Sequence, residues 1–313
     1  MKGLELSEKF YLEYGQPMLR EHFPALLDKI AVGLAGSGSE CFGYDDGLSS
    51  DHDFEPGFCI FLPDEDTVDR RTAFLLERAY SKLPREFMGY KRASLEPVGG
   101  NRHGVIRMSE FFEAKTGSSD GKLSLAAWLT LPEESLAEAV NGKVFFDGLG
   151  RFTEIRERLS YFPQDVRLKK LAGELLLMGQ SGQYNYPRCI KRADTAAAQM
   201  SAIEFVKSAL HVIFLLNGKY MPYYKWTFRA LSELNEMSEL ASPLEYLISS
   251  GNSESDAAKK QEIIENICQK IADALRKKEL SAFKRDELEA HAYAVNDKIA
   301  DGEMRNLHVL SAV

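Results

Sequence analysis

Two groups of polar residues near the N-terminus have the types and spacing needed to hold a metal ion beside a phosphate. The turn Gly36–Ser39 follows one apolar segment, and Asp51 and Asp53 precede the next, Phe58–Leu62. Carboxylates at i and i+2 point to the same face of an extended strand. Mg²⁺ takes one or two protein carboxylates together with substrate phosphates, and two aspartates can share two such ions. The pattern predicts that Asp51 and Asp53 are metal ligands and catalytic residues.

The glycine-serine turn is predicted to bind the phosphates. Gly36 and Gly38 permit unusual dihedrals and a close approach of the backbone, while Ser37 and Ser39 add hydroxyl groups. A plain surface loop is the alternative. His52 lies between the two aspartates and points to the opposite strand face, so we expect a core or interface histidine rather than a ligand.

These residues resemble two known families. Gly-Ser, a loop and Asp-x-Asp on a strand look like the signature of the polymerase-β-like nucleotidyltransferase superfamily, which includes kanamycin and lincosamide nucleotidyltransferases. Most of the chain is also similar to an uncharacterised bacterial family known as domain of unknown function 4037. This second resemblance rests on the segments Ala31–Leu34, Gly38–Gly43, Asp51–Asp53, Trp128 with Leu131–Glu133, Gln183–Tyr186 and Pro222–Trp226.

The superfamily resemblance implies a third carboxylate on a later strand, where it takes the acceptor's proton or completes the second metal site. The strand expected to align, Gly104–Met108, offers Arg107 instead. Glu96 before it or Glu110 after it is the substitute, and we take Glu96 as the third catalytic candidate; a surface position is the alternative for both. Arg107 is expected to neutralise phosphate charge, which guanidinium does bidentately.

Two polar segments stand out in the second half of the sequence. Lys225 lies among aromatic residues, and the resemblance implies that it reaches the nucleotide phosphates, as helical-domain lysines do in similar transferases. A lysine whose stem packs beside core aromatics is the alternative. Gln183–Arg188 combines polar and aromatic residues, which fits an acceptor or base pocket. It equally fits a hydrogen-bonding knot between helices, which we favour.

The elements that must position these residues follow from periodicity. Apolar patterns and caps predict two short helices over 7–30, a strand at 30–35, a strand at 58–62, a helix over 64–83, a strand at 103–108 and a helix from Ser109. From Leu131 onward the pattern is helical, including an amphipathic stripe within 256–278. Together with the resemblance, this predicts an α+β protein. A small mixed-sheet, nucleotidyltransferase-like domain at 1–121 precedes an all-helical bundle domain at 122–313.

Composition narrows the class of protein. The 313 residues are 44% hydrophobic and 27% charged, as in ordinary soluble proteins. No apolar run reaches membrane-span length and the first residues do not look like a signal peptide, so we expect a cytoplasmic protein without a membrane partner. Four scattered cysteines favour neither a zinc site nor disulfides. The formal net charge of −8 disfavours broad nucleic-acid binding. The sequence does not predict an oligomeric state.

These observations predict a Mg²⁺-dependent nucleotidyltransferase that moves NMP from an NTP, with ATP as the expected donor, to a hydroxyl acceptor. The acceptor is a small molecule, a protein side chain or an RNA end. The alternative is a nucleotide-binding or regulatory protein that has lost catalysis, indicated by the missing third acid on the strand that contains Arg107.

Overall fold

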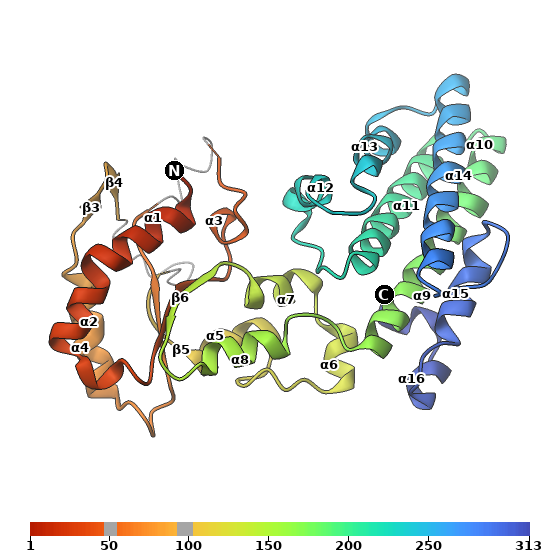
Figure 1. The fold of residues 1–313 in the computed structure, drawn as a ribbon. Helices are drawn as coiled ribbons and strands as arrows, with labels where there is room; N and C mark the ends of the chain where they lie inside the picture. The colour runs from red at the N-terminus through yellow and green to blue at the C-terminus, as the bar shows by residue number, and fades with distance from the viewer. Residues whose placement is uncertain (47–54, 93–102) are drawn as a thin grey trace. The chain divides into compact units, whose positions relative to one another are not determined.

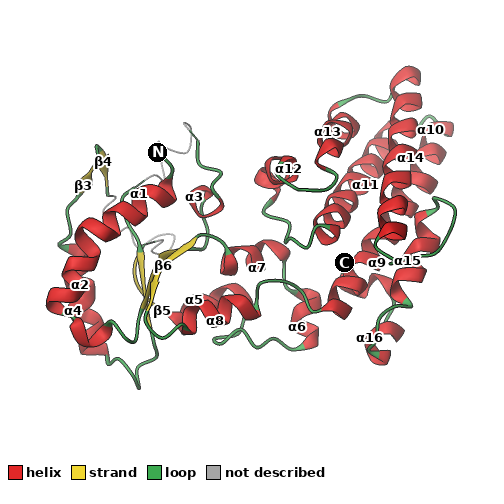
Figure 2. Cartoon of the chain, in the orientation of Figure 1, coloured by secondary structure: helices red, strands yellow, loops and turns green. Residues whose placement is uncertain are grey.

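The chain folds into two compact units, each with its own core (Figure 1). The computed structural model describes residues 1–46, 55–92 and 103–313. Unit 1 comprises Met1–Ser124 and Glu134–Ser160, and unit 2 comprises Leu125–Glu133 and Tyr161–Val313. The fold is α+β with a small mixed sheet (Figure 2), and 62% of the described residues are helical.

Unit 1 is built on a four-stranded sheet of order β5-β2-β1-β6. Its elements are α1 (Gly3–Phe10), α2 (Gln16–His22), β1 (Ala31–Leu34), α3 (Ser39–Phe42), β2 (Cys59–Leu62), α4 (Arg70–Ser81), β3 (Glu86–Phe87), β4 (Tyr90–Lys91), β5 (Gly104–Arg107), α5 (Met108–Thr116), α7 (Glu133–Val140), β6 (Lys143–Asp147) and α8 (Arg151–Arg158). β1 runs antiparallel to β2 and β6, whereas β2 and β5 are parallel. The sequence pattern did not predict β6, which pairs with β1 although it follows the start of the helical region.

The strand register brings four connections to one end of the sheet. Cys59, at the start of β2, pairs with Gly33 in β1 and with Gly104 at the start of β5. Leu34, at the end of β1, pairs with Lys143 at the start of β6. The exit of β1 and the entries of β2, β5 and β6 therefore lie together. We call this the Gly-Ser end of the sheet, because the turn Gly36–Ser39 leaves β1 there.

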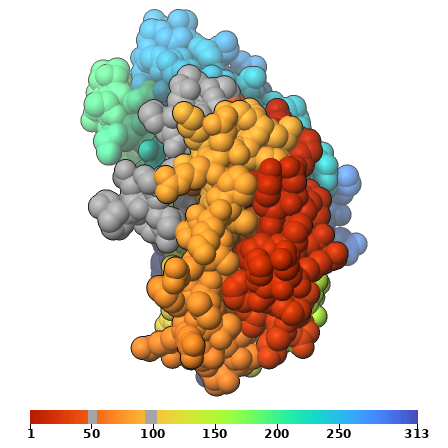
Figure 3. Space-filling model, turned by 90° about the vertical axis from the view of Figure 1, so that its left-hand side faces the viewer, coloured from red at the N-terminus to blue at the C-terminus, as the bar shows by residue number. Residues whose placement is uncertain are grey.

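The two faces of the sheet are covered by different helices, as the alternation of strand side chains requires. Val32 and Ile60 belong to an apolar cluster with residues of α1, α2 and α4. On the opposite face the ring of Phe61 stacks on Phe152 of α8 at 4.0 Å and meets Phe111 of α5 edge-on at 5.1 Å. Figure 3 views the first of these layers, where α1 and α2 (red) lie beside the segment from α4 to β4 (orange).

Unit 2 is built from helices joined by turns and loops. Its helices are α6 (Leu125–Thr130), α9 (Gln164–Met178), α10 (Tyr186–Lys191), α11 (Thr195–Leu216), α12 (Tyr224–Ser232), α13 (Ala241–Ser249), α14 (Glu254–Lys277), α15 (Leu288–Asn296) and α16 (Gly302–Asn306). Asp194 and Ser253 cap α11 and α14, because their side-chain oxygens accept from Ala197 N–H and Asp256 N–H. The C-terminal helices pack around α9 and α11 (Figure 1).

Within the described part of the chain, α11 is the one helix whose length and apolar composition would suffice to cross a membrane. The packing of unit 2 explains this composition, since 61% of the apolar window of α11 is buried inside the protein. Its neighbours include α9, α10 and α13. The apolar surface of α11 is thus used mainly for the core of a helical bundle.

Candidate functional site

The glycine-serine turn is held in a conformation that needs glycine. Gly36 and Gly38 have φ values of +112° and +137°, which side-chain-bearing residues rarely adopt. Asn141, in the connection between α7 and β6, holds the turn from both sides: Gly36 N–H donates to Asn141 Oδ1 at 2.8 Å, and Asn141 Nδ2 donates to the Gly36 carbonyl at 2.8 Å. The backbone of the turn is therefore fixed without help from the side chain of Ser37.

Arg156 in α8 positions the clamping asparagine. One of its Nη atoms donates to the Val140 carbonyl at 2.6 Å and to the Asn141 carbonyl at 2.7 Å. Its guanidinium also lies 5.7 Å from the ring centre of Phe152. Burial lowers the pKa of Arg156 below its usual value. The α7–β6 connection is thus tied both to the glycine-serine turn and to the helix behind the sheet.

The Ser37 hydroxyl takes part in a charged cluster. Ser37 Oγ donates to Glu138 Oε2 at 2.7 Å and accepts from Lys115 Nζ at 2.7 Å. Lys115 and Glu138 also form an ion pair with each other. Lys115 comes from the last turn of α5 and Glu138 from α7. The side chains of Lys115 and Glu138 are 21% and 19% exposed, so a ligand at the turn can reach them.

A carboxylate and a thiol are buried behind the turn. Glu40, the second residue of α3, is 4% exposed, and a Cβ atom placed on Gly38 would overlap its carboxylate. Cys59 at the start of β2 is also buried. Burial, with the nearby charge of Glu40, raises the pKa of the Cys59 thiol to about 12, so the thiol stays protonated at neutral pH.

The same end of the sheet has a second pair of polar side chains. Glu55 is the first described residue after the Asp51-His52-Asp53 motif, and His103 immediately precedes β5. His103 Nδ1 lies 2.9 Å from Glu55 Oε1. Since β2 and β5 are parallel and start at the Gly-Ser end, this contact ties the entry of one strand to the entry of the other.

The structure brings only part of the predicted site together. Gly36, Ser37, Gly38 and Ser39 lie together at the Gly-Ser end, with Ser39 opening α3. Asp51, Asp53 and Glu96 lie outside the described residues. Within residues 1–46, 55–92 and 103–313, no three His, Cys, Asp or Glu side chains are grouped so that they could hold a metal ion.

Arg107 lies at the other end of the sheet. It is the last residue of β5 and pairs with Leu62, the last residue of β2. Its Nη1 donates to the Pro63 carbonyl at 2.5 Å and to the Val68 carbonyl at 2.8 Å, which fixes the loop after β2. Arg107 and Glu110 line a pocket of about 290 Å³ there. Arg107 is not brought together with the glycine-serine turn, and its hydrogen bonds account for it structurally.

Lys225 belongs to unit 2, near the start of α12. Its side chain is exposed, and its Nζ lies 4.6 Å from the ring centre of Trp226. Such a contact stabilises a cation at a protein surface without removing it from water. The predicted contact with nucleotide phosphates stays a prediction.

Unit 2 buries a second charged cluster, which the sequence pattern did not single out. His211 Nδ1 lies 3.0 Å from Glu133 Oε1, and Glu133 Oε2 accepts from Met221 N–H at 3.0 Å. Burial raises the pKa of the nearby Glu174 carboxyl. For His211, burial alone would lower the pKa, but the hydrogen bond to Glu133 and the charges of Glu133 and Glu174 raise it overall. Within unit 2, this cluster connects Glu133 to α9, to α11 and to the segment that leads into α12.

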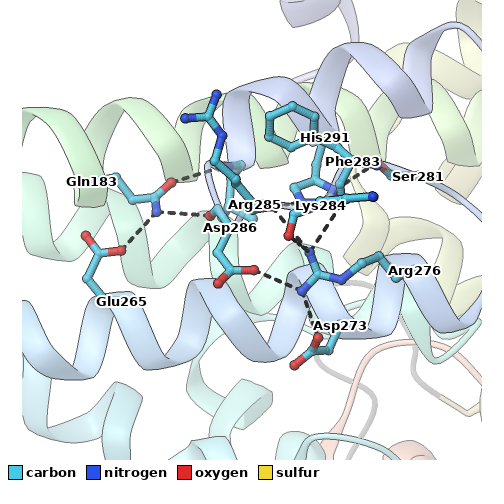
Figure 4. Close-up of polar contacts among 11 residues, drawn as sticks. Gln183, Glu265, Asp273, Arg276, Ser281, Phe283, Lys284, Arg285, Asp286 and His291 are labelled. Atoms are coloured by element: carbon cyan, nitrogen blue, oxygen red, sulfur yellow. Dashed lines mark hydrogen bonds and ion pairs between the residues drawn. The ribbon is translucent and has the colours of Figure 1, made fainter.

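Gln183 is part of a hydrogen-bonding knot between helices (Figure 4). Its Nε2 donates to Glu265 Oε2 at 3.0 Å and to the Asp286 carbonyl at 3.1 Å, while its Oε1 accepts from Leu288 N–H at 3.0 Å. Arg276 continues the network through ion pairs with Asp273 and Asp286. The side chain of Gln183 is thereby engaged in joining the π-helical segment after α9 to α14 and to the start of α15.

The comparison with protein families identifies one segment. Residues 128–227 match the family described as Domain of unknown function (DUF4037), which confirms that predicted resemblance over these residues. The match includes the segments named above that lie between Trp128 and Trp226, and both partners of the Glu133–His211 pair. No curated protein shows a significant match to the chain. The resemblance to nucleotidyltransferases stays a prediction.

Sequence reasoning missed the residues that surround the turn. Lys115, Glu138 and Asn141 reach Ser37 and Gly36 across 78, 101 and 105 positions of sequence. Each belongs to a segment whose local pattern indicates only a helix or its end. The pairing of β6 with β1, itself not predicted, places the connection that contains Asn141 at the Gly-Ser end, whereas Lys115 belongs to α5, which follows β5.

Proposed function

We propose that the protein is a Mg²⁺-dependent nucleotidyltransferase that moves NMP from an NTP, with ATP as the expected donor, to a hydroxyl group. The acceptor belongs to a small molecule, a protein side chain or an RNA end. One observation carries the proposal: the turn Gly36–Ser39 leaves β1 at the same end of the sheet where Glu55, two residues after Asp53, pairs with His103 at the entry of β5.

The sheet supports this proposal by its connectivity. A nucleotidyltransferase-like lobe requires a glycine-serine turn and an Asp-x-Asp segment on neighbouring strands. Here β1 and β2 are antiparallel neighbours, so Gly36–Ser39 after β1 and the described residues 55–58 before β2 belong to the same end of the sheet. The turn needs glycine for the positive φ values of Gly36 and Gly38, and it leaves Ser37 exposed to a ligand.

The reaction is mostly positioning and charge neutralisation. The acceptor oxygen forms a bond to the α-phosphorus, the bond from that phosphorus to the pyrophosphate oxygen breaks, and the acceptor's proton leaves to a base or to water. Bound Mg²⁺ would neutralise charge on the phosphates. The described residues alone do not form a metal site, so the proposal assigns the ion to Asp51 and Asp53 on their sequence pattern. Ser37 would orient a phosphate through its hydroxyl group.

A specific observation favours a second function, nucleotide binding without transfer. β5 contains no carboxylate, and Arg107 at its far end is engaged with backbone carbonyls. Glu96, the proposed third catalytic acid, lies outside the described residues. A protein that binds NTP but lacks the third acid would serve as a nucleotide-responsive regulator.

Calorimetry with ATP and Mg²⁺, followed by a pyrophosphate-release assay over a panel of hydroxyl acceptors, separates these functions. Binding with release supports the transferase, binding without release supports the regulator, and absence of binding rejects both.

Asp51→Asn and Asp53→Asn test the metal assignment. Each variant should keep the thermal unfolding temperature of the wild type, since a metal-binding carboxylate contributes affinity rather than core packing. Each should lose Mg²⁺-dependent nucleotide binding. Unchanged affinity for Mg²⁺-ATP in both variants would show that these aspartates are not the ligands.

A further inference from the structure

The charged cluster at the glycine-serine turn has the composition of a phosphate subsite occupied by a carboxylate of the protein itself. One oxygen of Glu138 accepts from Ser37 Oγ at 2.7 Å and pairs with the Lys115 ammonium. Phosphate oxygens also accept hydrogen bonds from hydroxyl and ammonium groups. We infer that Lys115 binds a terminal phosphate of the ligand, and that Glu138 holds the place of this phosphate in the free protein.

The cluster is not needed to shape the turn. The backbone of Gly36 is already fixed by Asn141, which Arg156 supports from α8. The ion pair of Lys115 and Glu138 is partly exposed, and pairs of this kind contribute little to stability. The arrangement of Ser37, Lys115 and Glu138 is therefore better explained by the binding of a ligand than by a contribution to folding stability.

The charges define the class of ligand. Lys115 offers three N–H donors and a full positive charge beside the Ser37 hydroxyl. Ser37 is exposed between Gly36 and Gly38, so its hydroxyl is open to a ligand from solvent. An anion that displaces Glu138 must supply at least as much negative charge as a carboxylate. The end of a polyphosphate chain meets this requirement, whereas an uncharged nucleoside does not.

Glu138 then acts as an electrostatic gate. The incoming phosphate competes with Glu138 for Lys115 and Ser37, so Glu138 weakens binding and excludes weakly charged ligands. This inference rests on the proposed function in taking a polyphosphate as the ligand. It goes further by naming the cation that binds the phosphate and the acid that regulates access to it.

Variants of the pair have opposite expected effects. Inorganic tripolyphosphate in metal-free buffer is the first probe, measured by calorimetry. Lys115→Met should weaken its binding by roughly 10- to 150-fold, the value of a charge-assisted contact. Glu138→Gln should tighten binding roughly 2- to 5-fold, the value of a partly exposed ion pair. Lys115→Arg retains the charge and should restore most of the affinity. This recovery would show that the weaker binding of Lys115→Met comes from the missing charge and not from misfolding.

A matched control is Lys122→Met. Lys122 also belongs to unit 1 and forms an ion pair, but its partner is Asp120, at 3.0 Å, and its side chain is 74% exposed. This variant should bind tripolyphosphate as the wild type does. Equal affinity of Lys115→Met and wild type would overturn the inference, as would absence of binding to both the wild type and Glu138→Gln.

Mg²⁺-ATP is the second probe and separates this inference from the proposed function. If Lys115→Met binds Mg²⁺-ATP as tightly as the wild type, Lys115 is not the phosphate residue and the proposed nucleotide site still stands. If tripolyphosphate binding depends on Lys115 but Mg²⁺-ATP neither binds nor releases pyrophosphate, the proposed function fails and the phosphate subsite remains.

Discussion

At the scale of single residues, the two units use charged side chains in different ways. Lys115 and Glu138 keep their charges within reach of solvent at the Gly-Ser end, beside the exposed Ser37. Glu133 in unit 2 is buried and accepts from both His211 and the Met221 backbone. An accessible charge can exchange its partner for a ligand, whereas a buried one mainly fixes the elements that it joins.

Lys225→Met tests whether the exposed lysine of α12 contributes to ligand binding. If Lys225 pairs with phosphate, ATP should bind roughly 10- to 150-fold more weakly while adenosine binding is unchanged, because only the charged part loses a partner. Lys259→Met is the matched control, since its Nζ also lies over an aromatic ring, that of Tyr246, at 4.1 Å. If calorimetry gives the same ATP affinity for both variants and the wild type, Lys225 does not bind phosphate, and its ring contact with Trp226 is its structural role.

His211 should make the stability of unit 2 depend on pH. Its folded pKa is raised above the ordinary value of 6.5, because the Glu133 hydrogen bond and nearby carboxylates outweigh burial. Protonated His211 therefore stabilises the fold fully below about pH 6.5, and this contribution is lost as the pH rises through the folded pKa. His211→Gln should cost about 1.5–3 kcal/mol at pH 5.5, the value of a hydrogen bond to a charged group, and less at pH 8.5, where the imidazole of the wild type has lost its charge.

Tryptophan fluorescence during urea unfolding measures this difference. The chain has two tryptophans, Trp128 and Trp226, and both belong to unit 2. His22→Gln, at an exposed position in unit 1, is the control and should leave the signal unchanged at both pH values. A loss in His211→Gln that is equal at pH 5.5 and pH 8.5 would contradict the raised pKa.

At the scale of elements, the apolar runs of the sequence were sufficient to predict the inner strands. The predicted strands at 30–35, 58–62 and 103–108 became β1, β2 and β5, each within one residue at either end. β6 was missed because Lys143–Asp147 is half-exposed and charged at both ends, so it lacks the apolar signal of a buried strand. The clamp by Asn141 was missed for the same reason, since it depends on where β6 places the connection from α7.

Asn141→Ala should loosen the glycine-serine turn. It removes both side-chain partners of Gly36, whose backbone is buried, and leaving buried backbone groups unpaired costs about 1–3 kcal/mol. Asn141→Asp retains the acceptor for Gly36 N–H but not the donor to its carbonyl, so its loss should be smaller. Hydrogen exchange of peptides that cover 31–42 measures the effect, with the exposed Asn235→Ala as control. Exchange in this segment that stays at the wild-type rate would refute the clamp.

At the scale of the whole molecule, the chain does not divide at a single point. Sequence patterning predicts a division at 121/122, where strand-like periodicity gives way to helical periodicity. The contacts group Glu134–Ser160 with unit 1 and Leu125–Glu133 with unit 2. The periodicity of a segment reports its local structure and not the core that it joins, so a helix such as α8 is indistinguishable in sequence from a helix of the bundle.

The fragments 1–121 and 1–160 distinguish the two divisions. Fragment 1–160 contains β6 and α8, which supply the second neighbour of β1 and the aromatic ring that stacks on Phe61. Fragment 1–121 lacks both, so Phe61 would lose a ring contact at 4.0 Å and one edge of β1 would have no partner strand. We expect 1–160 to unfold cooperatively on heating and 1–121 to show no cooperative transition by circular dichroism. Fragment 1–160 with Phe152→Ala is the intermediate case, since it keeps β6 and loses the ring, at a cost of about 3–5 kcal/mol. Cooperative unfolding of 1–121 at the temperature of 1–160 would mean that the first lobe is complete without β6 and α8.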